Sequence, residues 1–184
     1  MQTDKKVLII IPTYNEEENI REIINQIWAQ TPRAHVLVVD DNSKDDTQAI
    51  VRDIQREHPA MLHLLGRSGK LGLGTAYIAG FKWALARDYD VIIEMDADLS
   101  HDPKEVSAML REMEQCDVVI GSRYIPGGGT VNWTLPRKLI SRFGSLYART
   151  ILRMKVRDLT GGYNAWSRLV LTKIDLDAVK SEGY

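Results

Sequence analysis

Short apolar runs alternate with helical patterns along most of the chain. Runs of Val, Ile and Leu of this length are typical of strands that are buried on both faces of a sheet. We therefore predict strands over residues 7–11, 36–39, 61–65, 91–95 and 118–120.

The segments between these runs have the spacing of amphipathic helices. In the first of them, apolar side chains recur every three or four positions, at Ile20, Ile23, Ile24, Ile27 and Trp28. Further helices are predicted over residues 45–57, 75–87 and 103–114, the last beginning at Pro103, a favourable first helical residue. This alternation predicts an α/β fold with a mostly parallel sheet and helices on both faces, in a single domain over residues 1–184.

Polar and glycine-rich sequences follow every predicted strand. They read "PTYNE", "DDNS", "GRSGKLGLG", "DADLSH" and "GSRY" in chain order. In such sheets, ligands bind outside the carboxyl ends of the strands. We therefore expect these five segments to line one polar crevice.

The stretch "VIIEMDADLSHDP" carries two acids at the end of a buried strand, Asp96 and Asp98. Uncompensated charge there is costly, so the pair implies a metal ion, a shared proton or a cationic partner. Strand alternation would point both carboxylates the same way, and Mg²⁺ is bound by one or two carboxylates together with phosphate oxygens and water. We favour a metal site, since helix capping explains Asp102 but not both upstream acids.

Two further segments have both a structural and a functional interpretation. Asp40 and Asp41 suit a turn or a helix cap, yet an acid after the second strand can also bind a ribose or base, so we expect one of them in each role. The glycine-rich "GKLGLGTAY" fits neither the dinucleotide-binding nor the P-loop pattern. It is either a flexible loop ending at Gly74 or a mobile cover over phosphates that carries Lys70.

Composition narrows the possible environments of the protein. The 184 residues have a formal net charge of −1, which gives no indication of nucleic-acid binding. The single cysteine, Cys116, excludes an intramolecular disulfide, and the apolar run at the start is too short for a signal peptide or a spanning helix. These features predict a cytoplasmic protein.

Charge is nevertheless uneven along the chain, since residues 118–157 include no acid. If residues 137–154 form a helix, four of its basic side chains fall within an arc of about 60°: Lys138, Arg142, Arg149 and Arg153. Apolar residues occupy the neighbouring arc, among them Leu139, Phe143, Leu146, Tyr147 and Met154. The pattern is typical of a helix in a membrane interface, or of a core-packed helix with a solvated basic face.

Taken together, the motifs resemble those of a known family. "IIPTYNEEENI", "VVDDNSKDDT", "KLGLGTAYIAGF", "MDADLSHDP", "GSRYIPGGG", "RKLIS" and "DLTGGYNAW" are similar, in this order, to the dolichol-phosphate (polyprenol-phosphate) mannose synthases of glycosyltransferase family 2. The resemblance spans essentially the whole chain. It implies a GT-A (Rossmann-like) fold, a GDP-mannose donor, Mg²⁺ or Mn²⁺, and a polyprenyl or dolichyl monophosphate acceptor at the cytoplasmic face of a membrane, where the protein would be peripheral.

The resemblance also implies roles for individual residues. Pro12, Tyr14 and Glu16 would hold the guanosine, with Val39 and Asp41 at the base and ribose. Asp96, Ala97 and Asp98 would meet the diphosphate, with Asp96 and Asp98 as metal ligands. Arg123, Arg137 and Ser141 would bind the acceptor phosphate, and Asp98 and Arg123 would be the catalytic residues.

The chain departs from the family pattern at its end, where relatives continue beyond "KSEGY" with a basic loop and membrane-facing structure. Many inverting family members use a Glu-Asp base, which is absent here, and an ionised phosphate acceptor does not need one. Two alternatives remain open: a UDP-glucose-dependent transferase acting on the same lipid phosphate, and a non-catalytic, nucleotide-binding membrane adaptor. A phosphatase of the haloacid dehalogenase type would place its D-x-D motif after the first strand, not the fourth.

Overall fold

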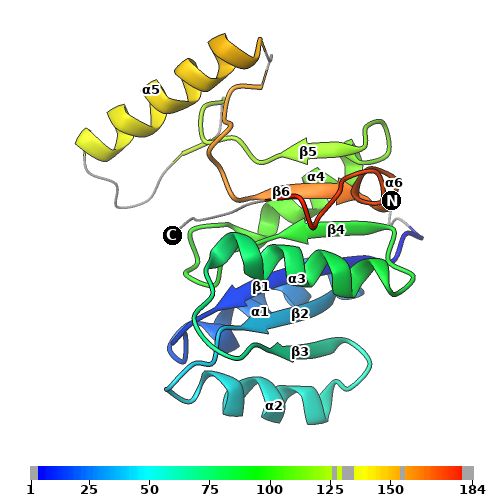
Figure 1. Ribbon diagram of the computed structural model, residues 1–184. Coiled ribbons are helices and arrows are strands. Elements are labelled where there is room, and N and C mark those ends of the chain that lie inside the picture. Colours follow the sequence, from blue (N-terminus) through cyan, green and yellow to red (C-terminus); the bar gives the residue numbers. More distant parts are fainter. Residues whose placement is uncertain (1–3, 126–127, 130–134, 154–155, 180–184) are drawn as a thin grey trace.

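The computed structural model describes residues 4–125, 128–129, 135–153 and 156–179, and it leaves the side chains of residues 135–139 undescribed. These residues form a six-stranded sheet in the order β3-β2-β1-β4-β6-β5 (Figure 1). The strands are β1 (Val7–Thr13), β2 (His35–Asp40), β3 (Leu62–Gly66), β4 (Val91–Glu94), β5 (Val118–Ile120) and β6 (Asn164–Ser167). All five predicted strands are present, with ends that shift by one or two residues.

The helices also follow the predicted pattern. They are α1 (Ile20–Gln30), α2 (Thr47–Glu57), α3 (Leu73–Leu85), α4 (Val106–Glu112) and α5 (Leu135–Leu152). A further short helix, α6 (Arg168–Leu171), was not predicted. The helix predicted to begin at Pro103 starts instead with a 3₁₀ turn, η1 (Pro103–Glu105), and continues as α4. The Asp102 carboxylate accepts a hydrogen bond from the Lys104 amide at 2.9 Å, so this acid caps the turn, as expected.

Strand β6 was not predicted from the sequence. It pairs antiparallel with both β4 and β5, whereas β1 pairs parallel with β2 and β4, and β2 with β3. Its sequence, Asn-Ala-Trp-Ser, is too short and too polar to stand out as an apolar run. The expected mostly parallel sheet is confirmed, with β6 as its one antiparallel member among the described strands.

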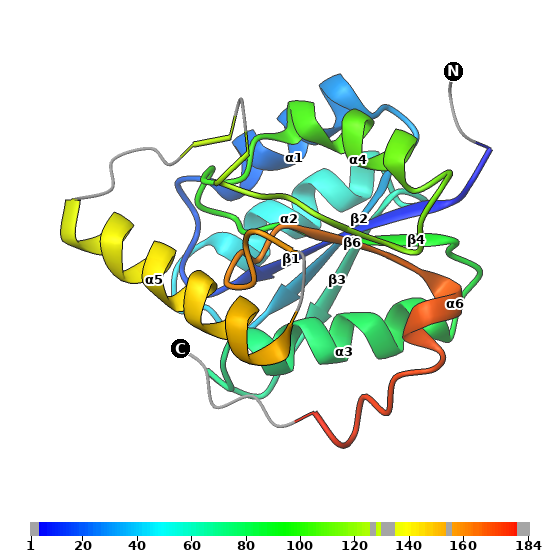
Figure 2. The same ribbon diagram turned by 90° about the horizontal axis from the view of Figure 1, so that it is seen from above.

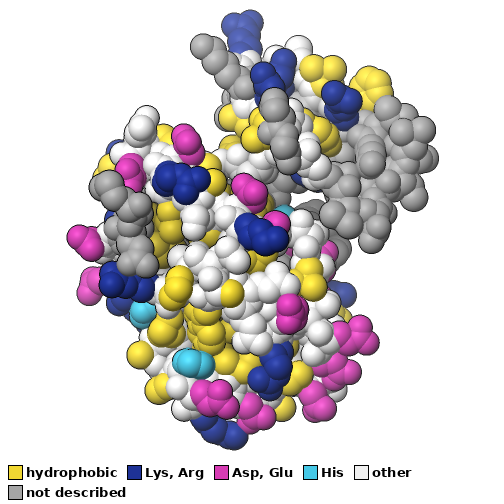
Figure 3. Space-filling view, turned by 180° about the vertical axis from the view of Figure 1, so that it is seen from behind, with side chains coloured by type: hydrophobic (Ala, Val, Ile, Leu, Met, Phe, Trp, Pro, Cys, Tyr) yellow, Lys and Arg dark blue, Asp and Glu magenta, His cyan; other side chains and the backbone are white. Residues whose placement is uncertain are grey.

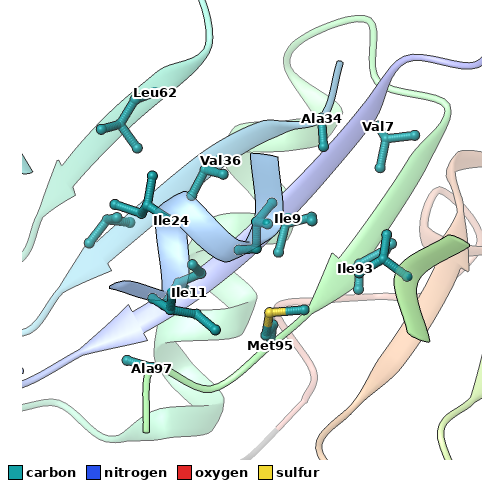
Figure 4. Close-up of a cluster of buried hydrophobic side chains, with 14 of the residues drawn as sticks. Val7, Ile9, Ile11, Ile24, Ala34, Val36, Leu62, Ile93, Met95 and Ala97 are labelled. Carbon is teal, nitrogen blue, oxygen red and sulfur yellow. The ribbon is translucent and has the colours of Figure 1, made fainter. Parts of the chain in front are cut away.

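Helices cover both faces of the sheet (Figure 2). On one face, Ile9, Ile11 and Ile93 pack against α1, α2 and α4, as the close-up of this cluster shows (Figure 4). On the other face, Leu8 and Ile10 pack against α3 and α6. Because side chains alternate along a strand, one apolar run supplies both cores.

Helix α3 lies very close to β1 at Gly80. A Cβ atom added there would stand 2.7 Å from Cγ2 and 2.8 Å from Cδ1 of Ile10. A larger residue would therefore require Ile10 or α3 to shift, so this glycine permits the close approach of α3 to β1.

Helix α5 lies apart from the sheet (Figure 1). Large apolar side chains on it are exposed, including Ile140 at 74%, Phe143 at 66% and Tyr147 at 70%. Ser145 is the only buried side chain among those described on this helix. The core-packed interpretation of this segment is therefore wrong. Within the described part of the chain, no helix is both long and apolar enough to cross a membrane.

We predict that Gly80→Ala lowers the free energy of unfolding by about 1–3 kcal/mol, because overpacking outweighs the better helix propensity of alanine. The loss should be smaller in an Ile10→Val background, which removes Cδ1. Gly144→Ala is the matched control, since a Cβ atom there meets nothing within 4 Å. Urea denaturation measures the free energy of unfolding of the three variants. An equal effect of both glycine substitutions would contradict the close-packing argument.

Candidate active site at the carboxyl ends of the strands

The two acids after β2 have separate sets of partners. Asp40 is fully buried and accepts hydrogen bonds from Thr13 Oγ1 at 2.9 Å, the Ser43 amide at 3.0 Å and the side chains of Ser43 and Gln48. Its carboxylate thus holds together the turn that leads into α2. Of the two expected roles, Asp40 has the structural one.

Asp41 instead holds the glycine-rich loop. Its Oδ1 pairs with Arg67 Nη1 at 2.7 Å, and its Oδ2 accepts from the amides of Leu71 at 2.8 Å and Gly72 at 3.1 Å. Arg67 Nη2 also donates to Thr75 Oγ1 in the first turn of α3. Asp41 and Arg67 therefore fix the point at which α3 begins.

The same loop reaches back over the residue that follows β1. Lys70 Nζ stands 4.3 Å from the centre of the Tyr14 ring, a cation–π distance. Because Asp41 holds the amides of the next two residues, Lys70 is placed at this edge of the sheet. The loop thus covers Tyr14, one of the residues expected at the guanosine.

Other residues expected at the donor are mostly part of the sheet or of the helix start beside it. The side chains of Val39 and Ala97 are buried in the two opposite cores, at 0% and 3% exposure. Pro12 pairs with Val39 in the sheet. Glu16 lies ahead of α1, where its carbonyl accepts from the amides of Asn19 and Ile20.

Strand β4 ends at Glu94, so Asp96 and Asp98 stand in the loop beyond it. The side-chain alternation continues past the strand, since Met95 and Ala97 both pack in the core shown in Figure 4. Asp96 consequently points to the other face, where Tyr77 of α3 donates a hydrogen bond to its Oδ1 at 2.8 Å. Asp98 Oδ1 accepts from the Ser100 amide at 3.0 Å.

The donor set suits a hard divalent cation that also binds phosphate. Asp96 and Asp98 supply carboxylate oxygens, which Mg²⁺ and Mn²⁺ prefer, and about a third of the Asp96 side chain is exposed. Among the described residues, no group of three or more His, Cys, Asp or Glu side chains could hold a metal ion. Two carboxylates alone make a weak site, so a bound diphosphate would have to complete it.

His101 closes the loop that contains Asp98. Its Nδ1 accepts a hydrogen bond from the Asp96 amide at 3.0 Å, and its ring stacks on Tyr163 with centroids 4.8 Å apart. Burial lowers the pKa of this imidazole, although the charges of Asp96 and Asp98 act in the opposite direction. The loop turns back at Leu99, whose φ of 60° lies in the left-handed region.

The residue expected at the acceptor phosphate, Arg123, is engaged in an ion pair. Its Nε and Nη2 each donate to the Asp158 carboxylate at 2.7 Å, and its amide donates to Asp158 Oδ2 at 3.1 Å. Asp158 is fully buried. Burial alone would raise the pKa of Asp158, but these hydrogen bonds outweigh it and lower the pKa. The same pairing raises the pKa of Arg123.

A cluster of hydroxyl groups connects this ion pair to α5. Arg123 Nη2 donates to Thr160 Oγ1 at 2.8 Å, and Thr160 Oγ1 lies 3.3 Å from Ser145 Oγ and 3.5 Å from Ser141 Oγ. Tyr124 also donates to Ser141 at 2.8 Å. Ser141 is thus beside Arg123, as expected, whereas the side chain of Arg137 lies outside those described.

The segment after Asp158 joins the two halves of the site. It passes from Thr160, beside Arg123, to Gly162, where an added Cβ atom would stand 3.8 Å from Asp96 Oδ2. The next residue, Tyr163, stacks on His101. The arginine expected at the acceptor and the acids expected at the metal therefore lie at the two ends of one short loop.

Sequence reasoning missed several residues of this site. Tyr77 was hidden in a helical pattern, and Asp158 was read only as part of a motif. Glu94 could have been found, since a lone acid inside an apolar strand must have donors. Asn164 and Trp166 of β6 supply them, at 2.8 and 3.0 Å, and burial raises the pKa of Glu94.

Comparison with known proteins identifies the family of the chain. The model of glycosyl transferase family 2 matches residues 8–174, and the chain belongs to this family. It is 46% identical over 181 residues to the polyprenol monophosphomannose synthase of Mycolicibacterium smegmatis, covering 98% of this chain and 68% of that protein. It is 48% identical over 179 residues to the undecaprenyl-phosphate mannosyltransferase of Micrococcus luteus, covering 97% and 73%.

Solved structures show the fold. Glucosyl-3-phosphoglycerate synthase of Mycobacterium tuberculosis, in complex with Mn²⁺, UDP-glucose and phosphoglyceric acid, superposes with a TM-score of 0.65 at 22% identity, over 93% of this chain and 60% of that one. A mannosyltransferase of Pyrobaculum calidifontis, in complex with GDP-Man and Mn²⁺, gives 0.63 at 20% identity, over 92% and 46%. The chain thus spans less than two thirds of these structures, and the expected GT-A fold is confirmed.

The ion pair gives an asymmetric stability prediction. Arg123→Met should cost about 3–5 kcal/mol of unfolding free energy, because it leaves the fully buried Asp158 charge without its partner. Asp158→Asn should cost less, about 1–3 kcal/mol, because the partly exposed guanidinium can turn to water. Urea denaturation at pH 7 measures both, and the reverse order would contradict the assignment.

The pH dependence checks the same pair independently. The pKa of Asp158 is lower in the folded state, so the stability that it contributes is present above its unfolded pKa of about 4 and is lost as the pH falls through the folded value. Asp158→Asn should flatten the stability profile below about pH 4 and leave its slope near neutral pH unchanged.

Proposed function

We propose that the protein transfers mannose from GDP-mannose to a polyprenyl or dolichyl monophosphate, with inversion, at the cytoplasmic face of a membrane. The main support is the identity of 46–48% over almost the whole chain to two proteins named for mannosyl transfer to such lipids. In the candidate site, Arg123 and Asp96 lie at the two ends of the short loop after Asp158, an arrangement that suits a reaction between an anionic acceptor and a diphosphate donor.

The identity of the donor is inferred from the nucleotides bound in the two solved structures. The Pyrobaculum mannosyltransferase was solved with GDP-Man, which favours GDP-mannose, whereas the Mycobacterium synthase was solved with UDP-glucose. Transfer of glucose from UDP-glucose is therefore the second candidate. Titration with GDP and UDP separates them, since a mannosyltransferase of this type should bind GDP more tightly.

Asp96 and Asp98 would hold the divalent cation, Mg²⁺ or Mn²⁺, and both solved relatives contain Mn²⁺. When bound, such an ion stabilises the charge that develops on a departing diphosphate. The chain itself supplies the anchor for this site, because Tyr77 and the Ser100 amide orient the two carboxylates. Asp41 and Arg67 place Lys70 over Tyr14, beside the expected nucleoside.

The acceptor needs to be positioned more than deprotonated. A phosphate monoester is already ionised near neutral pH, so a general base is unnecessary and holding the acceptor in line with the sugar is the main requirement. Arg123, held by Asp158, and Ser141 would bind the phosphate, together with Arg137 of α5. Because Asp158 compensates part of the Arg123 charge, we expect the arginine to act chiefly through directed hydrogen bonds.

We predict that Asp98→Ala abolishes metal-dependent transfer of mannose from GDP-mannose to a polyprenyl phosphate, with an unchanged urea midpoint because Asp98 caps only an exposed amide. The transfer is measured as the radiolabelled mannose that passes from GDP-mannose into the lipid phase. Asp102→Ala is the matched control, since this acid caps η1 and should leave turnover nearly intact. Undiminished transfer by Asp98→Ala would remove the metal site, and no transfer by the unmodified chain would favour the non-catalytic adaptor.

Membrane docking would explain the surface of α5. Its described basic side chains, Arg142 and Arg149, are exposed beside the exposed Phe143 and Tyr147. In the view from behind, hydrophobic and basic side chains lie next to one another on the upper part of the molecule, where α5 is found (Figure 3). An amphipathic helix with this composition binds an anionic membrane interface. The side chains of Lys138, Leu139 and Met154 lie outside those described.

The prediction is that replacing Arg142, Arg149 and Arg153 together by Gln weakens binding to anionic liposomes about 100-fold, since each basic residue near such a surface contributes about 1 kcal/mol. The same triple change at Arg21, Arg33 and Arg52, which are exposed on other parts of the surface, should have little effect. Binding should also weaken at 1 M salt, where the Debye length is about 3 Å. Equal losses in both triple variants would contradict docking through α5.

A further inference from the structure

Asp96 is held from two sides, its side chain by Tyr77 and its backbone by His101. Tyr77 reaches it from α3 and hydrogen-bonds Oδ1 at 2.8 Å, and His101 accepts its backbone N–H at 3.0 Å. The side chain is thus fixed by one element and the backbone by another. Asp98, by contrast, has one hydrogen bond from a neighbouring amide and remains exposed.

Among the residues that the structure describes, the hydroxyl of Tyr77 hydrogen-bonds this carboxylate only. The ring is buried at 6% exposure and lies in the core with Phe81, so a phenylalanine would fill the same space. The phenol occupies one oxygen of Asp96 and leaves Oδ2 on the other side of the carboxylate. A carboxylate oriented in this way is prepared to give one oxygen to a cation without first losing rotational freedom.

His101 faces the same oxygen but is not set up to bind metal through it. Because Nδ1 accepts an N–H, the proton of the neutral ring lies on Nε2, which stands 3.7 Å from Asp96 Oδ2. A protonated nitrogen cannot be a ligand. Stacking on Tyr163 and the left-handed turn at Leu99 hold the ring in this orientation.

We propose that Tyr77 and His101 are positioning residues for Asp96, which fix its carboxylate so that Oδ2 is presented to the divalent cation. The proposal rests on the metal site of the proposed function. Neither residue touches the cation. Each sets the geometry of a residue that does, and partners of this kind change metal affinity about 10- to 100-fold when they are removed.

The first test measures Mn²⁺ affinity directly, from the electron paramagnetic resonance signal of free Mn²⁺ at saturating GDP. Tyr77→Phe should bind Mn²⁺ about tenfold more weakly than the unmodified protein. The matched control is Tyr89→Phe, which also removes a tyrosine hydroxyl, here hydrogen-bonded to His35 at the opposite ends of the strands, and should leave the affinity unchanged. Unaltered affinity in Tyr77→Phe, with a normal urea midpoint, would overturn the proposal.

A double variant separates this inference from the proposed function. If Tyr77 acts through Asp96, then Tyr77→Phe should cause no further loss in an Asp96→Asn background. A full tenfold loss in that background would show that Tyr77 acts elsewhere and would overturn the proposal while leaving the metal site in place. If the unmodified protein binds no Mn²⁺, or if Asp96→Asn binds it normally, the metal site and this inference both fail.

Two substitutions of His101 test its part. Asparagine places an amide oxygen near the position of Nδ1 and can still accept the Asp96 N–H, whereas glutamine places its amide near Nε2. His101→Asn should therefore keep most of the Mn²⁺ affinity and His101→Gln should lose about tenfold. The opposite order would assign the role to Nε2 and would overturn the positioning of the Asp96 backbone.

Discussion

Buried carboxylates at the carboxyl ends of the strands must be compensated by donors, and most of the loop structure follows from this requirement. Asp40 and Asp158 are fully buried, and Asp41 and Glu94 nearly so. Each accepts hydrogen bonds from at least two donor groups, and at least one of these groups comes from a distant part of the chain. The loops are shaped by the need to bring those donors to the acids.

The consequence is that the acids are divided into two groups. Those fully supplied with donors serve as fixed points: Asp41 for the start of α3, and Asp158 for Arg123. Asp96 and Asp98 have fewer partners and more exposure, which suits the proposed contact with a cation. Asp41, although expected at the base and ribose, belongs by its contacts to the first group, because Arg67 and the amides of Leu71 and Gly72 already hold its carboxylate.

Features of the fold and the site that depend on neighbouring residues could be predicted from the sequence, whereas contacts between distant residues could not. Strands β1 to β5 and their crevice follow from local apolar runs, and the motifs gave Asp96, Asp98 and Arg123. The partners of these residues could not be found in the same way. Tyr77 meets Asp96 and Asp158 meets Arg123 only after the chain has folded, because each pair is far apart in the sequence. Strand β6 is short, and only its neighbours in the sheet define it.

Helix α5 connects the surface of the molecule to this crevice. It makes few contacts with the sheet, and its hydroxyl groups at Ser141 and Ser145 lie against Thr160, which itself accepts a hydrogen bond from Arg123. Thr160 thus lies between α5 and the guanidinium, while Tyr124, next to Arg123 in the chain, contacts α5 directly by donating to Ser141 at 2.8 Å. Hydroxyl contacts of 3.3–3.5 Å are weak and adjustable. The contacts of α5 with Thr160 are therefore looser than the pairing of Arg123 with the fully buried Asp158 at 2.7 Å, so Arg123 is held chiefly by Asp158 and less by α5.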